Sequence, residues 1–187
     1  MSAISQPKAL WKHIPKFTRG GAYVIDVPWR MIEFTLEGWA KDQPVNTDPD
    51  YQRAHVWNEE QQRRYVEYIM RGGYAAKEIR WNCTTWTRSP RYSTPVELVD
   101  GKQRLEAVRK FMRGELMAFG HFFADWDGLD ILVCTMKWYV NDLSTRAEVL
   151  QWYIDLNTGG VIHSDEEIQR VRALLEQERR PAQQEGV

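Results

Sequence analysis

The residues with the clearest chemical potential form the run Asp100-Gly101-Lys102-Gln103-Arg104. It follows the apolar residues 96–99 and opens a stretch with helical spacing, residues 105–113. A strand that turns through glycine straight into a helix leaves the first helical N–H groups without intrahelical partners, and glycine allows a ligand close to the backbone. Lys102 and Arg104 add cationic donors to a helix end that already carries positive partial charge. The pattern predicts an electropositive cradle, open to solvent, for a phosphate of a nucleotide or of a nucleic-acid backbone.

The same run has a simpler interpretation as an ordinary strand–turn–helix connection. In that case Asp100 and Gly101 only make the turn, and the side chains of Lys102 and Arg104 are solvated. Asp100 is also a candidate ligand for magnesium, but aspartates at turns usually serve the turn itself. The residues alone leave both interpretations open.

Two further loops contain polar residues beside expected helix ends. In residues 48–57, Arg53 could hold a phosphate, Gln52 could bond a base or ribose, and Tyr51 or Trp57 could stack. The alternative places the two aromatic residues in the core, and we favour it for Trp57. Residues 156–164, which include Asn157, fit a functional loop and a simple helix cap equally well.

The composition excludes several classes of protein. The chain has 187 residues, 43% of them hydrophobic, which is enough for one domain with a real core. The net charge of −1 argues against a protein that coats polyanions generally. Two cysteines without paired spacing favour a reducing compartment over a disulfide scaffold or zinc site. With no signal peptide and no apolar run of about 18 residues, we expect a cytoplasmic protein without a membrane partner.

Charge is uneven along the chain. Residues 1–25 contain no acid, and we expect residues 1–22 to be a flexible basic arm whose cations could contact nucleic acid: Lys8, Lys12, Lys16 and Arg19. Residues 23–178 are expected to form a single domain, and residues 179–187 a frayed tail.

Periodicity predicts a mixed α/β (α+β) domain with a small sheet. Strands are expected at 23–29, 79–83, 96–99, 116–123 and 131–140, and a loop at 42–55. Helices are expected at 31–41, from the Asn58 cap to Gly72, from Lys102 to Gly114, from the Ser144 cap to Asn157, and from the Ser164 capping box onward.

Familiar catalytic motifs are absent from the sequence. The four histidines are scattered, and there is no HxxxH or His-Asn-His cluster, no GxSxG elbow and no Walker A motif. Cys83 and Cys134 lie in strand-like contexts and are expected to be buried rather than nucleophilic.

Three ordered motifs resemble the GmrS-type N-terminal domain: Tyr51-Gln52-Arg53 to Trp57, Val99 to Leu105, and Leu156 to Gly160. The family signatures read roughly QR…W, DGQQRL and LNxGG, and the resemblance spans about residues 23–175. It implies a ParB/sulfiredoxin-like fold, in which a small mixed sheet is flanked by helices and followed by C-terminal helices. It also implies nucleotide binding and action on or along DNA.

Carried over by matching position, the resemblance implies that Asp100, Gly101, Gln103 and Arg104 act in phosphate binding and hydrolysis, with Asp100 and Arg104 as the catalytic candidates. It implies further that Gln52, Arg53 and Asn157 close the site. Lys102 replaces the first glutamine of the family motif and adds a charge. Because sulfiredoxins hold their catalytic cysteine at this place, Lys102 excludes sulfinic-acid reductase activity.

Three functions stay open. The first is an NTPase or nuclease in DNA metabolism or phage–host conflict, using a nucleoside triphosphate and Mg²⁺. The second is a non-catalytic DNA-binding module, which the near-neutral charge weakens. The third is a protein-interaction module, such as an inhibitor of a host factor, which the intact Asp100 weakens. A stand-alone copy of the domain is typical of viruses of bacteria, which implies the host cytoplasm.

Overall fold

A computed structural model describes residues 17–18, 21, 23–52, 56–87, 94–158 and 165–179. Its centre is a five-stranded sheet in the order β1-β5-β3-β4-β2. The strands are β1 (Tyr23–Pro28), β2 (Val45–Asn46), β3 (Glu78–Asn82), β4 (Val96–Asp100) and β5 (Thr135–Asn141). The β1–β5 and β3–β4 pairs are antiparallel, whereas β3–β5 and β2–β4 are parallel. The expected fold class, a small mixed sheet with flanking helices, is confirmed.

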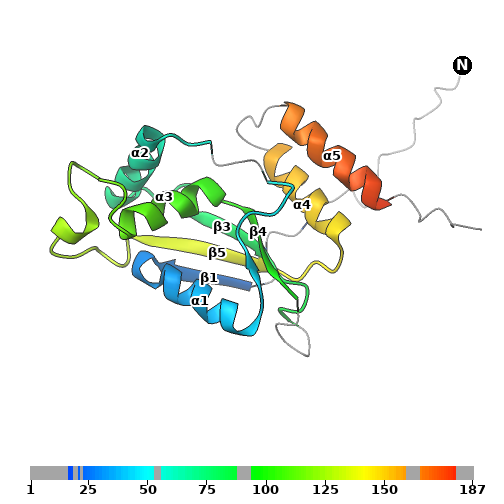
Figure 1. Ribbon diagram of the computed structural model, residues 1–187, viewed down its shortest axis with the longest axis horizontal. Coiled ribbons are helices and arrows are strands. Elements are labelled where there is room, and N and C mark those ends of the chain that lie inside the picture. The colour runs from blue at the N-terminus through cyan, green and yellow to red at the C-terminus, as the bar shows by residue number, and fades with distance from the viewer. Residues whose placement is uncertain are drawn as a thin grey trace, which may run out of the picture.

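Five α-helices surround the sheet: α1 (Ile32–Asp42), α2 (Glu59–Met70), α3 (Lys102–Met112), α4 (Arg146–Thr158) and α5 (Asp165–Arg179). Figure 1 shows α4 and α5 at one end of the molecule and the segment between α3 and β5 at the other. The site at the β4–α3 turn lies between these two ends.

The main core joins one face of the sheet to α1, α2 and α3. Its centre is aromatic: the ring of Trp138 lies 5.1 Å from Trp81 and 5.1 Å from Trp39. On β3, Ile79 and Trp81 point into this core and are fully buried. Because side chains alternate along a strand, Glu78 and Arg80 face the other side of the sheet.

A second core forms where α4 and α5 pack on each other and on β4. It contains Tyr51 and Val99, both fully buried, together with Leu150, Trp152 and Val171 from the two helices. The C-terminal helices therefore attach at the strand and loop that precede the Asp100 turn.

Local capping signals predicted α2 well. The Asn58 side chain accepts from the backbone N–H of Gln61, and the Gln61 side chain accepts from the N–H of Asn58, each at 2.9 Å. Gly72, with φ +88°, follows the end of the helix. Ser164 and the side chains of residues 165 and 167, expected to form a second capping box, lie outside the described part.

Two expected strands are wrong or too long. Residues 116–123 form a tight turn with one bridge, Ala118–His121, because Phe119 and Gly120 adopt positive φ angles of 51° and 78°. Residues 131–134 form a turn whose N–H groups at 132 and 133 donate to Asp130 Oδ1, so the strand begins only at Thr135. Conversely, the expected loop 42–55 contains β2, which is too short for a periodic signal.

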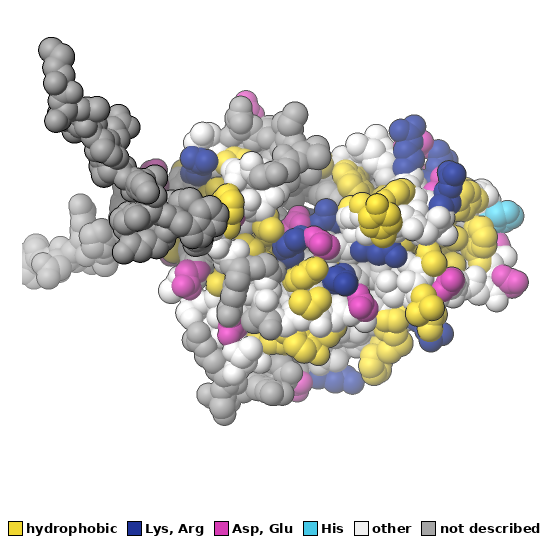
Figure 2. Space-filling model, turned by 180° about the vertical axis from the view of Figure 1, so that it is seen from behind, with side chains coloured by type: hydrophobic (Ala, Val, Ile, Leu, Met, Phe, Trp, Pro, Cys, Tyr) yellow, Lys and Arg dark blue, Asp and Glu magenta, His cyan; other side chains and the backbone are white. Residues whose placement is uncertain are grey.

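No helix among the described residues is long and apolar enough to cross a membrane. On the face seen in Figure 2, basic and acidic side chains are interspersed and do not gather into a patch of one sign. The expected basic arm contributes only residues 17, 18 and 21 to the described part. The backbone N–H of Thr18 donates to Asp155 of α4 at 3.1 Å. The predicted domain limits stay a prediction.

Candidate functional site

The turn between β4 and α3 requires a glycine. Gly101 is the N-cap of α3 and has φ +102°, a conformation that L side chains rarely adopt. A Cβ at this position would lie 2.5 Å from Ile79 Cδ1 and 3.1 Å from the carbonyl oxygen of Glu78. Gly101 therefore sets both the turn and the close approach of α3 to β3.

Asp100 accepts from two arginines. Arg104 Nη2 lies 2.7 Å from Asp100 Oδ2, and Arg80 Nη1 lies 3.4 Å from the same oxygen. Arg80 also bonds Glu78 at 2.5 Å, and its guanidinium lies 5.3 Å from the centroid of the Tyr139 ring. The site therefore has a cation that the sequence interpretation missed.

Register explains the position of Arg80. It pairs across the sheet with Asp100 on one side and Tyr139 on the other, so the three side chains form a row on one face. The polar residues Glu78 and Arg80, alternating with buried Ile79 and Trp81, were the available signal in the sequence.

The turn is balanced in charge. Lys102 forms an ion pair with Asp48, so each cation of the cradle has a carboxylate beside it. The expected excess of positive charge is therefore absent from the described residues of the turn. The Nε atoms of Arg80 and Arg104 are nevertheless buried without a hydrogen-bond partner among the described groups. An incoming anion must compete with these carboxylates or arrive together with a cation.

Gln103 holds the segment before α2. Its side-chain oxygen accepts from the N–H groups of Val56 at 3.0 Å and of Trp57 at 3.1 Å. Gln52 donates to the carbonyl oxygen of Leu98 at 2.5 Å. Both glutamines thus tie the flanking loop to β4 and α3, and their role toward a ligand stays a prediction.

Tyr51 is fully buried, which agrees with the alternative that places it in the core and not with stacking on a base. Its hydroxyl donates to the Leu98 carbonyl at 3.4 Å, and burial raises its pKa well above the usual value. Trp57, for which we favoured a core position, is partly buried and packs against the main core.

Arg170 of α5 fixes the loop that holds Gln52. Its guanidinium donates to the backbone carbonyls of Asp50 and Tyr51, each at 2.8 Å, and of Gln52 at 3.4 Å. Nothing in the sequence connects residue 170 with this loop, because the contact depends on how α5 packs.

A small cavity opens at the turn. Its volume is 80 Å³, and it is lined by Gln52, Trp57, residues 99–104 and Tyr153. The structure therefore brings Gln52 and the whole run Asp100–Arg104 together. Asn157 lies one helical turn beyond Tyr153, where its side chain donates to the Tyr153 carbonyl at 2.7 Å. Since drug-sized ligands occupy pockets of about 300 Å³ or more, this cavity suits only a group such as a phosphate.

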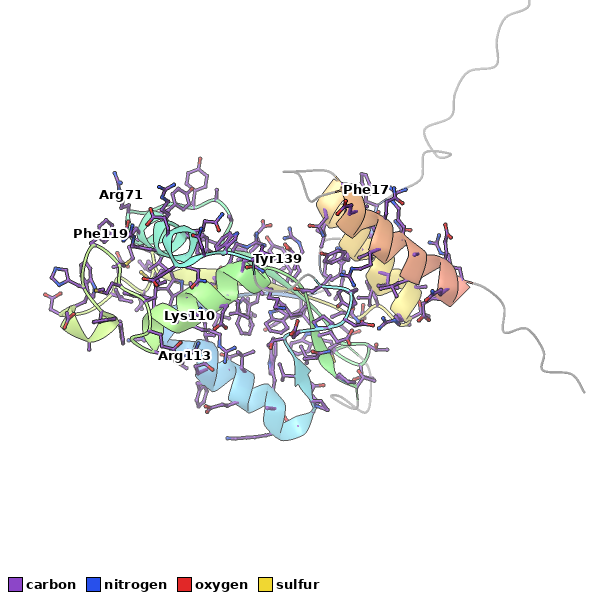
Figure 3. The ribbon with its side chains drawn as sticks, turned by 45° about the horizontal axis from the view of Figure 1, so that its top comes forward. Phe17, Arg71, Lys110, Arg113, Phe119 and Tyr139 are labelled. Atoms are coloured by element: carbon purple, nitrogen blue, oxygen red, sulfur yellow. The ribbon has the colours of Figure 1, made fainter. Side chains whose placement is uncertain are left out.

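A larger groove runs along α3 beside the cavity. It measures 410 Å³, and its lining includes Asp48, Leu105, Arg109 and Lys110. Lys102 lines both the groove and the small cavity. Figure 3 shows Lys110 on α3, further along the helix from the turn.

The structure does not describe every residue that was predicted to belong to the site. Arg53, Lys8, Lys12, Lys16 and Arg19 lie outside the described residues. Within the described part, no group of three or more His, Cys, Asp or Glu side chains is arranged to hold a metal. Magnesium binding by Asp100 stays a prediction that would need phosphate oxygens as additional ligands.

Residues 36–132 match the family described as "GmrSD restriction endonuclease, N-terminal domain". The chain belongs to this family. The expected family is thereby confirmed, although over a shorter span than the motifs suggested. The match includes residues 51–57 and 99–105 but not Asn157.

The fold is similar to that of the C-terminally truncated chromosome-partitioning protein ParB from Caulobacter crescentus, complexed with CTP-gamma-S, with a TM-score of 0.38 and 14% identity. The alignment covers 83% of this chain and 64% of the ParB chain, so the chain spans less than two thirds of that protein. No curated protein was found to match the chain.

Proposed function

We propose that this GmrSD-type domain binds a nucleoside triphosphate with its phosphates at the β4–α3 turn. The observation that carries the proposal is the position of Lys102, which lines both the phosphate-sized cavity and the groove along α3. A phosphate in the cavity would lie at the N-terminus of α3, where the helix dipole favours negative charge. The nucleoside would then extend into the groove.

Charge balance at the turn makes a divalent cation part of the proposal. A triphosphate alone would meet Asp100 and Asp48 as well as the three cations of the site. Mg²⁺ bound to the phosphates offsets this repulsion and gives Asp100 a role as a ligand or as the group that positions water. Lys102 would leave Asp48 for the phosphates, and Arg104 would stabilise charge on them.

Hydrolysis is the finer form of the proposal. It requires Asp100 to act on Mg²⁺ or water, with Arg104 stabilising the transferred phosphoryl group. The alternative retained from the sequence is a binding module without turnover, and the tight engagement of Asp100 by two arginines favours it. Release of inorganic phosphate separates the two.

A thermal-shift panel of ATP, GTP, CTP and UTP, each with and without Mg²⁺, tests the proposal. One nucleotide with Mg²⁺ should raise the melting temperature, because it binds only the folded chain. Lys102→Ala should lower the affinity for that nucleotide about tenfold or more, since a charge-assisted hydrogen bond contributes about 1.5–3 kcal/mol. Lys41→Ala, which changes an exposed lysine of α1, is the matched control. Equal affinity in Lys102→Ala and the control would overturn the proposed site.

A further inference from the structure

A second cavity lies far from the nucleotide site proposed above. It measures 230 Å³ and is bordered by residues 28–30, at the end of β1 and before α1, by the end of α3, and by the segment between α3 and β5. Its lining is mainly apolar and includes Trp29, Met112, Phe123, Trp126, Leu129 and Cys134. Figure 1 shows the α3–β5 segment at the end of the molecule remote from α4 and α5. In Figure 3, Phe119 of this segment and Phe17 mark the two opposite ends.

Two tryptophans that line the cavity have indole N–H groups that are unpaired within the described part of the chain. The indole N–H groups of Trp29 and Trp126 are buried without an acceptor among the described residues, and Trp29 is only 2% exposed. Trp81, Trp138 and Trp152 share this property but lie in packed core regions, away from this cavity. A buried donor without a partner costs free energy, and because both nitrogen atoms are covered, an occupant gains a hydrogen bond only where its entry uncovers one of them.

Apolar surface continues outside the cavity. Leu132 is 83% exposed, and its neighbour Ile131, which lines the cavity, is 42% exposed. Phe122, next to lining residue Phe123, is also exposed. Because a small molecule inside the cavity would leave these side chains in water, the wider surface fits a polypeptide.

The segment between α3 and β5 carries more acidic than basic side chains. The chain has no lysine or arginine from residue 114 to residue 136, whereas the same stretch contains Glu115, Asp125, Asp127 and Asp130. Asp127 and Arg30 both line the cavity. Lys77 Nζ donates to the Val133 carbonyl at 2.6 Å, and Arg113 pairs with Glu115 at 2.7 Å. The four acids of the segment outnumber these three nearby cations, and the excess favours a basic partner over a nucleic acid.

We propose that this cavity is a docking site for a basic polypeptide that inserts one aromatic or branched apolar side chain. The inserted side chain fills an apolar volume that is smaller than the about 300 Å³ of a drug-sized ligand pocket. A backbone carbonyl beside it accepts from the Trp29 or Trp126 indole. Lysine or arginine residues next to it meet Asp127, and Leu132 is covered by the partner.

Three short probe peptides test the proposal by isothermal titration against the full chain. The first is acetylated and amidated Lys-Lys-Trp-Lys-Lys; the second has Glu in place of every Lys, and the third has Ala in place of Trp. Only the first should bind, because only it supplies both the anchor and the complementary charge. Asp127→Lys should lower the affinity for the first peptide about tenfold, while Glu176→Lys, on the exposed surface of α5, should leave that affinity unchanged.

Each other result counts against the proposal. If the alanine peptide binds as tightly as the first peptide, charge alone drives binding. If the glutamate peptide binds as tightly as the first, charge does not contribute to binding. N-acetyltryptophanamide binding as tightly as the first peptide identifies a small-molecule pocket instead. Absence of binding by the first peptide also overturns it. Because Asp127 is exposed, an unchanged melting temperature of Asp127→Lys confirms that the variant is folded. Nucleotide binding at the turn is not involved in any of these readouts.

Discussion

Arg104 Nη2 lies 2.7 Å from Asp100 Oδ2, so the last residue of β4 is paired with the first turn of α3. The same oxygen accepts from Arg80 at 3.4 Å. Asp100 thus occupies the guanidinium of Arg104, which lines the small cavity at the turn. Under the proposed function, this carboxylate acts as a gate for phosphate, which opens when Mg²⁺ or another cation binds Asp100.

Asp100→Asn tests this gate. Without the carboxylate, Arg104 is available to a metal-free triphosphate, so its affinity should rise while the effect of Mg²⁺ on affinity shrinks. Any phosphate release should be lost. We expect a stability cost of about 1–3 kcal/mol, measured by urea unfolding, because Arg104 loses its carboxylate partner while Arg80 keeps Glu78. Weaker metal-free binding in a folded variant would contradict the gate.

Gly101→Ala tests the backbone of the turn. The positive φ and the contact with Ile79 should together cost roughly 2–4 kcal/mol in free energy of unfolding. Gly38→Ala is the matched control, since it lies within α1 with no atom within 4 Å of the added Cβ and should stabilise by about 0.5–1 kcal/mol. Equal effects of the two substitutions on urea unfolding would show that the turn tolerates a side chain.

Arg170→Ala tests whether α5 positions the loop before α2. Loss of its bonds to the carbonyls of residues 50–52 should loosen Gln52 and weaken nucleotide binding several-fold, although residue 170 does not line the cavity. Arg172→Ala, on the exposed side of the same helix, should bind normally. Titration calorimetry measures both variants, and equal affinities would remove α5 from the account of the site.

Features set by residues close together in the sequence were predictable, whereas contacts between distant segments were not. The ends of α2 and the turn at Gly101 were predictable because caps and glycine conformations are set by neighbouring residues. Arg80 was missed because its contact with Asp100 depends on the register of β3 with β4, which shifts between Arg80 and Trp81. Arg170 was missed for a similar reason, since its contact with residues 50–52 arises from packing between distant segments.

The false strand at 116–123 has a different origin. Its residues are apolar enough for a strand, but they cover the end of the molecule and do not join the sheet. The positive φ of Phe119 reverses the chain there, and the backbone N–H of Phe119 donates to Glu67 of α2 at 2.8 Å. Neither feature has a periodic signal in the sequence.

Glu97 of β4 should make stability depend on pH. Burial, its main influence, raises the pKa of Glu97 above the ordinary value. The folded state therefore favours the protonated carboxyl group of Glu97, so protonation at low pH stabilises the fold. This stabilisation is lost as the pH rises through the raised pKa. Glu97→Gln should raise the melting temperature at neutral pH, and the gain should shrink below pH 4.5, where the carboxyl group is protonated in both states. Glu37→Gln, on exposed α1, is the control, and a gain that does not vary with pH would contradict the assignment.

The most direct measurement of the central claim is an amide ¹H–¹⁵N NMR titration of the full chain with inorganic triphosphate and Mg²⁺. If phosphate binds at the N-terminus of α3, the largest shifts should fall on the amides of Gly101, Lys102, Gln103 and Arg104, and Lys102→Ala should reduce them. Unchanged amides at this turn, with no shifts or with shifts confined to other parts of the chain, would contradict the account.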